Sequence, residues 1–203
     1  MDPKSLLLAS LREQVTPSML RLGFTLVPSR PAFTRKTGDV IHEVSFGRSR
    51  HNGADRCSFW SAWAVRSPEL RSWYTAFVGQ PPQDQYLVVT NDWLLEGWPR
   101  SPIGFSLTSD EAHNASEMDA FLQGGIQVGI PFLEQNSTTE SAVAFWQKRG
   151  LRTDRVVELL LMSGQEDRAR SIVGAEFESW QASHSQVLSQ LGPAAAKAFA
   201  APP

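Results

Sequence analysis

The sequence predicts an α+β fold in which an N-terminal helix leads into an antiparallel β-meander, with C-terminal helices packed on the sheet. Three observations predict it. Apolar residues recur at helical spacing up to residue 22, short β-rich runs separated by turn residues follow at residues 24–65, and helix-start signals dominate from residue 108 onwards. Because the helices follow the strands instead of alternating with them, this order favours α+β over a doubly wound parallel sheet.

The first element is an amphipathic helix that starts at Pro3, a residue suited to the first helical turn. Leucine, valine and methionine side chains form one apolar stripe along it. Pro17 removes a backbone donor, so we expect the helix to be kinked or divided near Thr16. Gly23 is a natural C-terminal stop.

Four apolar runs then predict antiparallel strands, at residues 24–27, 32–35, 40–46 and 57–65. Turn residues 36–39 separate the second run from the third, and the longer loop 48–56 separates the third from the fourth. A meander is the simplest topology for such a series. Residues 67–77 predict a short helix, and 86–90 and 105–107 predict two further strands.

The remainder of the chain predicts helices. Residues 108–111 and 137–140 both match the capping-box pattern. Gly129 with Pro131 is expected to end the first of these helices and Gly150 the second, and two more are expected at 153–163 and 166–191. We expect one domain over residues 1–191, with a helix-and-sheet part (1–107) and a helical part (108–191). Residues 192–203, rich in alanine and proline, are expected to form a flexible tail.

Composition narrows the class of protein. The 203 residues carry a net charge of -2, with 41% hydrophobic and 20% charged residues, as in ordinary globular proteins. Such a chain has no overall field that attracts nucleic acid or an anionic membrane. The single cysteine, Cys57, provides neither an intrachain disulfide nor a zinc cluster, which fits a reducing compartment. No run of ~20 apolar residues is present, and we expect a cytoplasmic protein without a membrane partner.

No motif for catalysis, a metal or a cofactor is recognisable in the sequence. The glycine-rich segment 124–129 lacks the lysine of a phosphate-binding loop, and we interpret it as a helix stop. His51, Asp55 and Cys57 are the only local group of metal-ligand residue types, and we interpret them as a polar loop. If Cys57 pairs with residues near 47, it lies roughly 16 Å from His42, too far for a thiolate–imidazole pair.

The loop 48–56 and the tryptophans form the most suggestive surface. The loop places three arginines and a histidine at one end of a predicted hairpin, where guanidinium groups could bind carboxylate or phosphate. Trp60 and Trp63 are an odd number of residues apart, so they point to opposite faces of a strand and only one can enter a given core. Exposed tryptophans are common interface anchors. The predicted partner-binding residues are Arg48, Arg50, His51, Arg56, Trp60, Trp63 and Trp73.

The N-terminal third resembles the bacterial domain-of-unknown-function family 4304. The resemblance is carried by the runs 17–24, 33–35, 38–41 and 46–50, and the later run Leu159-Leu160-Leu161 with Gly164 looks similar to the end of that family. It implies a bacterial origin and an α+β architecture. Small cytoplasmic families of this kind often include immunity proteins that neutralise a neighbouring toxin.

Our first hypothesis is therefore a non-catalytic bacterial protein-binding protein, in the more specific form an immunity protein bound to a cognate toxin. An alternative is a hydrolase-like enzyme whose acid and base come together only in the fold, with His42, His51 or His113 and nearby acids as candidates. A second alternative is a nucleotide or RNA binder, which requires the arginines and tryptophans to share one face. The near-neutral, slightly acidic balance argues against general nucleic-acid binding.

Overall fold

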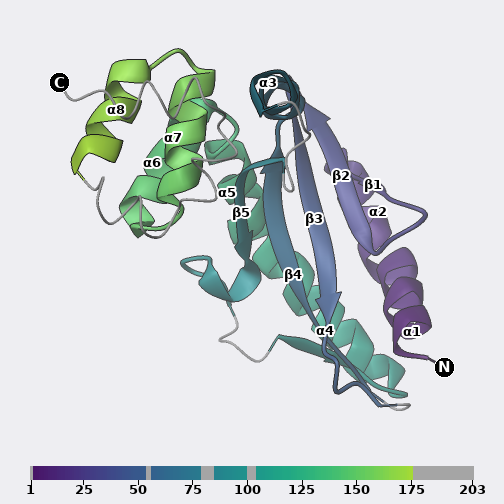
Figure 1. The fold of residues 1–203 in the computed structure, drawn as a ribbon. Coiled ribbons are helices and arrows are strands. Elements are labelled where there is room, and N and C mark those ends of the chain that lie inside the picture. Colours follow the sequence, from purple (N-terminus) through teal and green to yellow (C-terminus); the bar gives the residue numbers. More distant parts are fainter. Residues whose placement is uncertain (1, 54–55, 79–84, 100–103, 176–203) are drawn as a thin grey trace. The chain divides into compact units, whose positions relative to one another are not determined.

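The computed structural model describes residues 2–53, 56–78, 85–99 and 104–175. They form the α+β fold expected, with an N-terminal helix, an antiparallel meander and C-terminal helices (Figure 1). The chain divides into two compact units, each described here by itself. The first comprises residues 1–66 and 89–135, and the second comprises residues 67–88 and 136–203. None of the described helices is long and apolar enough to span a bilayer.

The first unit begins with a helix in three parts: α1 (Pro3–Ser10), the π-helical turn η1 (Leu11–Val15) and α2 (Thr16–Arg21). The carboxylate of Asp2 caps α1 by accepting from the amides of Lys4 and Ser5. The expected division near Thr16 is confirmed: the π-turn ends at Val15, and α2 begins at Thr16, the residue before Pro17. Gly23, with a φ of 80°, ends the helix as predicted.

The sheet has the strand order β1-β2-β3-β4-β5, and β6 pairs with β4. The meander from β1 to β4 is confirmed, with antiparallel pairing at each step. The pairing predicted for the β3–β4 hairpin is wrong in one respect: Gly47 lies opposite Trp60 and not opposite Cys57. His42 pairs with Val65, so Cys57 is still farther from His42 along the sheet than the sequence predicts. The strands are β1 (Thr25–Leu26), β2 (Ala32–Thr37), β3 (Val40–Arg48), β4 (Cys57–Arg66), β5 (Tyr86–Asn91) and β6 (Phe105–Leu107).

A long helical segment, α4 (Glu111–Gly124), η3 (Gly125–Gly129) and α5 (Ile130–Gln135), packs with α1 and α2 on one face of this sheet (Figure 1). Two sequence predictions about it are wrong. Gly129 and Pro131 do not end the helix, because the chain continues through the π-helical η3 directly into α5. The N-cap is Asp110 and not Thr108; its carboxylate accepts from the amides of Ala112 and His113.

The aromatic core of the first unit explains why this segment is rich in glycine. Trp63 on β4 is 0% exposed, and its ring lies so close to the helix that a Cβ on Gly129 would come within 2.6 Å of it. A Cβ on Gly125 would come within 3.1 Å. Phe121 on α4 packs against the same indole, with ring centroids 6.2 Å apart. The glycines therefore serve close helix–sheet packing instead of stopping a helix.

The outer edge of β6 is closed by side chains of α4. The carboxylate of Glu117 accepts from the amide of Ser106 at 2.9 Å, and the Asn114 side chain both accepts from and donates to the backbone of Thr108. The imidazole of His113 lies 2.9 Å from the Ser106 carbonyl oxygen. These polar groups satisfy backbone positions that a neighbouring strand would otherwise occupy.

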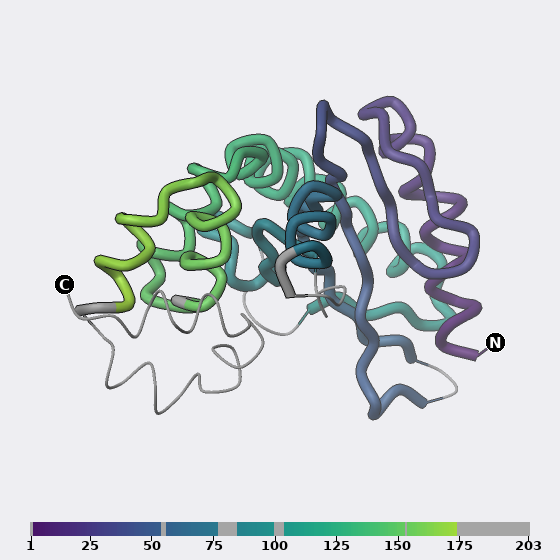
Figure 2. Tube along the Cα trace, turned by 45° about the horizontal axis from the view of Figure 1, so that its top comes forward, coloured from purple at the N-terminus to yellow at the C-terminus, as the bar shows by residue number. Residues whose placement is uncertain are grey.

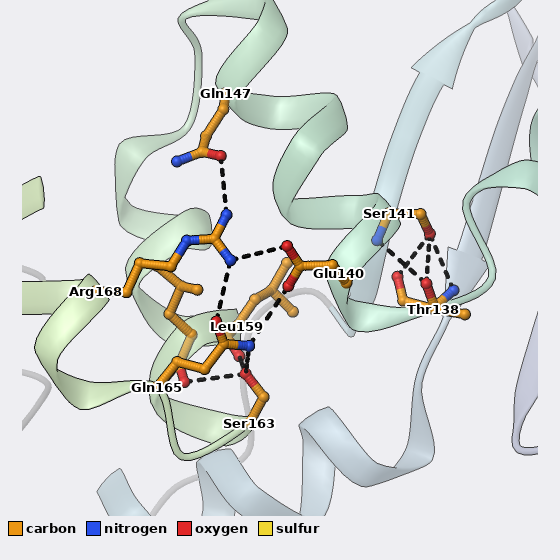
Figure 3. A network of polar contacts seen from close by, with 9 residues as sticks. Thr138, Glu140, Ser141, Gln147, Leu159, Ser163, Gln165 and Arg168 are labelled. Atoms are coloured by element: carbon orange, nitrogen blue, oxygen red, sulfur yellow. Dashed lines mark hydrogen bonds and ion pairs between the residues drawn. The ribbon is translucent and has the colours of Figure 1, made fainter.

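The second unit contains the helices α3 (Pro68–Val78), α6 (Thr139–Arg149), α7 (Thr153–Met162) and α8 (Glu166–Ala175). The predicted ends of α6 at Gly150 and of α7 near Ser163 are confirmed. The N-cap of α6 is Thr138 and not Ser137, and its capping box is completed by Ser141 (Figure 3). Helix α8 begins at Glu166 as expected, while the predicted continuation to 191 and the tail 192–203 lie outside the described residues.

Polar contacts join the three consecutive helices of this unit. Arg168 on α8 donates to Glu140 on α6 at 2.8 Å and to Gln165 at 3.0 Å (Figure 3). Gln165 also donates to Ser163, at the end of α7. Because the side chains of Arg168 and Glu140 are 40% and 61% exposed, this ion pair adds little to stability and mainly fixes the orientation of α8 against α6.

Candidate functional site

The end of the β3–β4 hairpin carries the predicted arginine loop, and Figure 2 shows it projecting at the lower edge of the view. The side chain of Asn52 holds the loop, because it accepts from the Ser58 amide at 2.8 Å and donates to the Ser58 carbonyl at 3.1 Å. Arg50, His51 and Arg56 are exposed around this anchor. Two arginines and a histidine therefore gather at one end of the sheet.

Arg48 differs from the other three because of its place in the register. It pairs with Phe59 and so lies on the same face as the helix-covered aromatic core. Hydrogen bonds from Ser5 and, more weakly, the charge of Arg48 lower the pKa of the Asp2 carboxyl at the start of α1. Arg48 is thus oriented towards the N-terminal helix, away from the opposite face on which Trp60 lies.

We call the face of β2, β3 and β4 opposite the covering helices the open face; it carries Ala32, Thr34, Lys36, Ile41, Glu43, Ser45, Gly47, Ser58, Trp60, Ala62, Ala64 and Arg66. Ala32, Glu43 and Ala64 are buried on this face. Trp60 lies over Gly47, its cross-strand partner. A Cβ on Gly47 would come 2.4–2.6 Å from three atoms of the indole, so only glycine allows the ring to lie against the strand. Trp60 is half-buried and contacts Trp93 edge to face, with centroids 6.1 Å apart.

Trp93 reaches this position through a residue that the sequence reasoning missed. Asp92 begins the short helix η2 (Asp92–Leu94) and is 1% exposed. Its carboxylate accepts from the Ser61 amide and hydroxyl, both at 2.8 Å, and from the Trp93 amide at 2.8 Å. Burial raises the pKa of Asp92, although these hydrogen bonds oppose the shift. Asp92 therefore fixes η2 to β4 and positions Trp93 beside Trp60.

Leu94 is an exposed apolar side chain next to this aromatic pair in the sequence. It follows Trp93 in η2 and is 52% exposed. We call Trp60, Trp93 and Leu94 the tryptophan patch. The patch consists of the half-buried indoles of Trp60 and Trp93 and the exposed side chain of Leu94.

Two of the tryptophans predicted to bind a partner do not belong to this patch. Trp63 is completely buried, and its indole NH donates to the Ser61 hydroxyl at 2.9 Å, so the structure corrects its predicted role as a surface contact. The expectation that Trp60 and Trp63 point to opposite faces is confirmed. Trp73 lies on α3 in the second unit, half-buried and in edge-to-face contact with Tyr74.

His42, one of the histidines considered for catalysis, is buried and contacts Arg35. His42 is 0% exposed on the helix-covered face, where Arg35 donates to its Nδ1 at 3.0 Å. Burial and, to a smaller extent, the charge of Arg35 lower the pKa of His42 to about 4, so the imidazole is neutral at physiological pH. Arg35 also donates to Glu134 at 2.9 Å. This arrangement ties β2 and β3 to α5.

Cys57 and its neighbours make a poor nucleophile or metal site. The thiol is fully buried, and burial raises its pKa, which disfavours the reactive thiolate. His51 is exposed, and Asp55, the third member of the predicted group, lies outside the described residues. Over the described ranges, no three His, Cys, Asp or Glu side chains are placed to hold one metal ion.

Comparisons with protein-family models, with curated proteins and with solved structures find no match to this chain. The functional argument therefore depends on the geometry of the tryptophan patch, the hairpin cations and the open face.

Proposed function

We propose that this chain is a non-catalytic protein-binding protein whose contact surface combines the tryptophan patch with the cations of the hairpin end. The observation that carries the proposal is the Trp60–Trp93 pair on the open face. Trp60 lies on the opposite side of β4 from the aromatic core, so its indole adds nothing to that core. Buried Asp92 and the absent side chain of Gly47 hold the pair in place. Preorganised tryptophans of this kind are typical energetic centres of protein interfaces.

The cations favour an acidic partner surface. Arg50 and Arg56 are exposed at the hairpin end, although the whole chain has a net charge of -2. Positive charge concentrated beside an apolar anchor increases the rate of association with a negatively charged surface. An immunity protein that seals the active site of a toxin is the more specific form of this proposal, and it agrees with the resemblance to family 4304.

The test is to capture partners with the tagged wild-type chain and with Trp60→Ala, and then to measure Kd with the purified partner. Truncation of a central tryptophan typically costs about 2 kcal/mol or more, so we expect Kd to rise at least ~30-fold. Leu20→Ala is the matched control, because Leu20 is a 55% exposed apolar side chain on α2. It is expected to leave Kd unchanged.

The arginines are tested by Arg50→Glu combined with Arg56→Glu. We expect a slower association rate and a weaker dependence of that rate on salt. A partner that binds both this variant and Trp60→Ala as tightly as the wild type would show that the contact surface lies elsewhere.

A further inference from the structure

The Asn52 side chain, which anchors the hairpin end, is followed in the sequence by Gly53. The other asparagines, Asn91, Asn114 and Asn136, are followed by aspartate, alanine and serine. Glycine after asparagine leaves the next amide nitrogen sterically open to the side-chain carbonyl carbon, because no Cβ stands beside that nitrogen. The one Asn-Gly step of the sequence therefore lies at the residue that holds the hairpin end in place.

In the described part of the chain, neither backbone conformation nor packing requires glycine at position 53. The φ of Gly53 is not positive, and a Cβ on it would meet no atom within 4 Å. Gly47 and Gly129 differ, because a Cβ on either would overlap a tryptophan ring. Gly53 is exposed, and no hydrogen bond from its amide to another described residue is found. Its nitrogen is accessible for a reaction with the neighbouring side chain.

The contacts of Asn52 define what such a reaction would disrupt. The Ser58 amide donates to Asn52 Oδ1 at 2.8 Å, which identifies this atom as the carbonyl oxygen and draws electrons away from Cγ. Asn52 Nδ2 donates to the Ser58 carbonyl oxygen at 3.1 Å. The same carbonyl oxygen also accepts from the Ser49 amide at 3.0 Å. The strands therefore stay connected at Ser49 without Asn52, whereas the loop beyond Ser49 depends on it.

We infer that Asn52 is a deamidation site that releases the hairpin end. The Gly53 nitrogen loses its proton and forms a bond to Cγ of Asn52, the Cγ–Nδ2 bond breaks, and ammonia leaves with a proton. Water then opens the cyclic imide by breaking either of its C–N bonds, which gives aspartate or isoaspartate. Both products lack the Nδ2 donor, and isoaspartate also lengthens the main chain.

Deamidation changes both the contacts and the charge of the hairpin end. In the aspartate form, a carboxylate oxygen without a proton replaces Nδ2 beside the Ser58 carbonyl oxygen, so this contact becomes repulsive. The new negative charge lies in the loop that carries the exposed Arg50 and Arg56. The consequence for a partner rests on the proposed function: the modified chain should associate more slowly with an acidic surface.

The test incubates the full chain in mildly alkaline buffer, where the Gly53 amide loses its proton more readily, and locates the modified asparagines by peptide mass spectrometry. We expect Asn52 to convert at least ~10-fold faster than Asn114, which is buried and hydrogen-bonded through both ends of its amide but precedes alanine. Gly53→Ala, which the open space around residue 53 allows, should slow the conversion of Asn52 at least ~5-fold.

Hydrogen exchange measured by NMR reports the release of the loop. In the deamidated wild type we expect the Ser58 amide to exchange at least ~5-fold faster than in the fresh protein. The Ala62 amide, farther along β4 and opposite Ser45, should change less than ~2-fold, because the pairing of β3 with β4 is kept. Gly53→Ala incubated in the same way is the matched control, and its Ser58 amide should exchange as in the fresh variant.

Equal conversion of Asn52 and Asn114, no effect of Gly53→Ala, or an unchanged Ser58 amide in deamidated protein would overturn the inference. The captured partner keeps this inference apart from the proposed function. If Asn52 is not converted while Trp60→Ala weakens the complex, the deamidation site is wrong and the contact surface stands. If deamidation releases the Ser58 amide but neither it nor Trp60→Ala weakens the complex, the inference about Asn52 holds and the contact surface lies elsewhere.

Discussion

Two glycine–tryptophan contacts allow the same perturbation, one added methyl group, to be compared in a closed and an open environment. In Gly129→Ala the new Cβ would lie 2.6 Å from three ring carbons of Trp63. Trp63 is 0% exposed and confined by Trp98 and Phe121, so the ring cannot swing away. In Gly47→Ala the Cβ would lie 2.4 Å from Trp60, but this indole is half-buried and can move towards solvent.

The gain from replacing glycine with alanine and the cost of overpacking combine differently in the two variants. Alanine is more favourable than glycine in a helix by about 1 kcal/mol, and overpacking a closed core costs about 1–3 kcal/mol, sometimes more. Contact with three ring atoms favours the upper end of that range, so we expect Gly129→Ala to lower the free energy of unfolding by about 2 kcal/mol. In a strand, alanine gains about 0.5–1 kcal/mol over glycine. Gly47→Ala should therefore stay within about 1 kcal/mol of the wild type.

Urea denaturation followed by circular dichroism measures both variants. Trp63→Phe provides the check on mechanism: in that background, with a smaller ring, Gly129→Ala should cost at least about 1 kcal/mol less, as a double-mutant cycle would show. If Gly129→Ala is as stable as the wild type, or if the two glycine variants cost the same, close packing against Trp63 is not what requires glycine there. Gly47→Ala should also alter the near-ultraviolet dichroism of the Trp60–Trp93 pair and weaken partner binding, despite its small effect on stability.

Two further predictions concern buried titratable groups. Asp92→Ala removes the acceptor for the Ser61 amide and hydroxyl and should lower the free energy of unfolding by about 3 kcal/mol, whereas Asp92→Asn, which keeps one acceptor oxygen, should cost less; urea titrations of both check this. The pKa of His42 falls from 6.5 to about 4 on folding, so the unfolded chain binds the extra proton and stability is lost as pH falls from about 6.5 towards 4. This loss, up to about 3 kcal/mol, should be absent in His42→Gln, and an unchanged difference between the two proteins over that range would contradict the assignment.

The element order was predictable because it depends on local signals. Gly23 and Gly150 both adopt positive φ at helix ends, as expected of helix-terminating glycines. The segment 124–129 contains the same residue type and was wrongly interpreted as a stop. What distinguishes the two cases is the contact of Gly125 and Gly129 with Trp63, more than 60 residues earlier in the sequence, which no local pattern contains.

The candidate site was predictable only in part, for a related reason. Spacing alone showed that Trp60 and Trp63 face opposite sides, but not which side the helices cover. The three-residue difference in the β3–β4 register placed Trp60 over Gly47. Asp92 has no sequence signal, because an acid after a strand is ordinary; its role arises from contact with Ser61, 31 residues earlier.

Glu43 shows how a polar surface can be specified by non-local pairing. Alternation along β3 places Glu43 on the face away from the aromatic core, where an acid would normally be solvated. It is instead buried by Arg30 and Arg66, which approach from 13 residues before it and 23 after it. An unpaired carboxylate at 1% exposure would be strongly destabilising, so Glu43 keeps at least one guanidinium in place on the open face. The same acid therefore also positions the guanidinium groups that contact it.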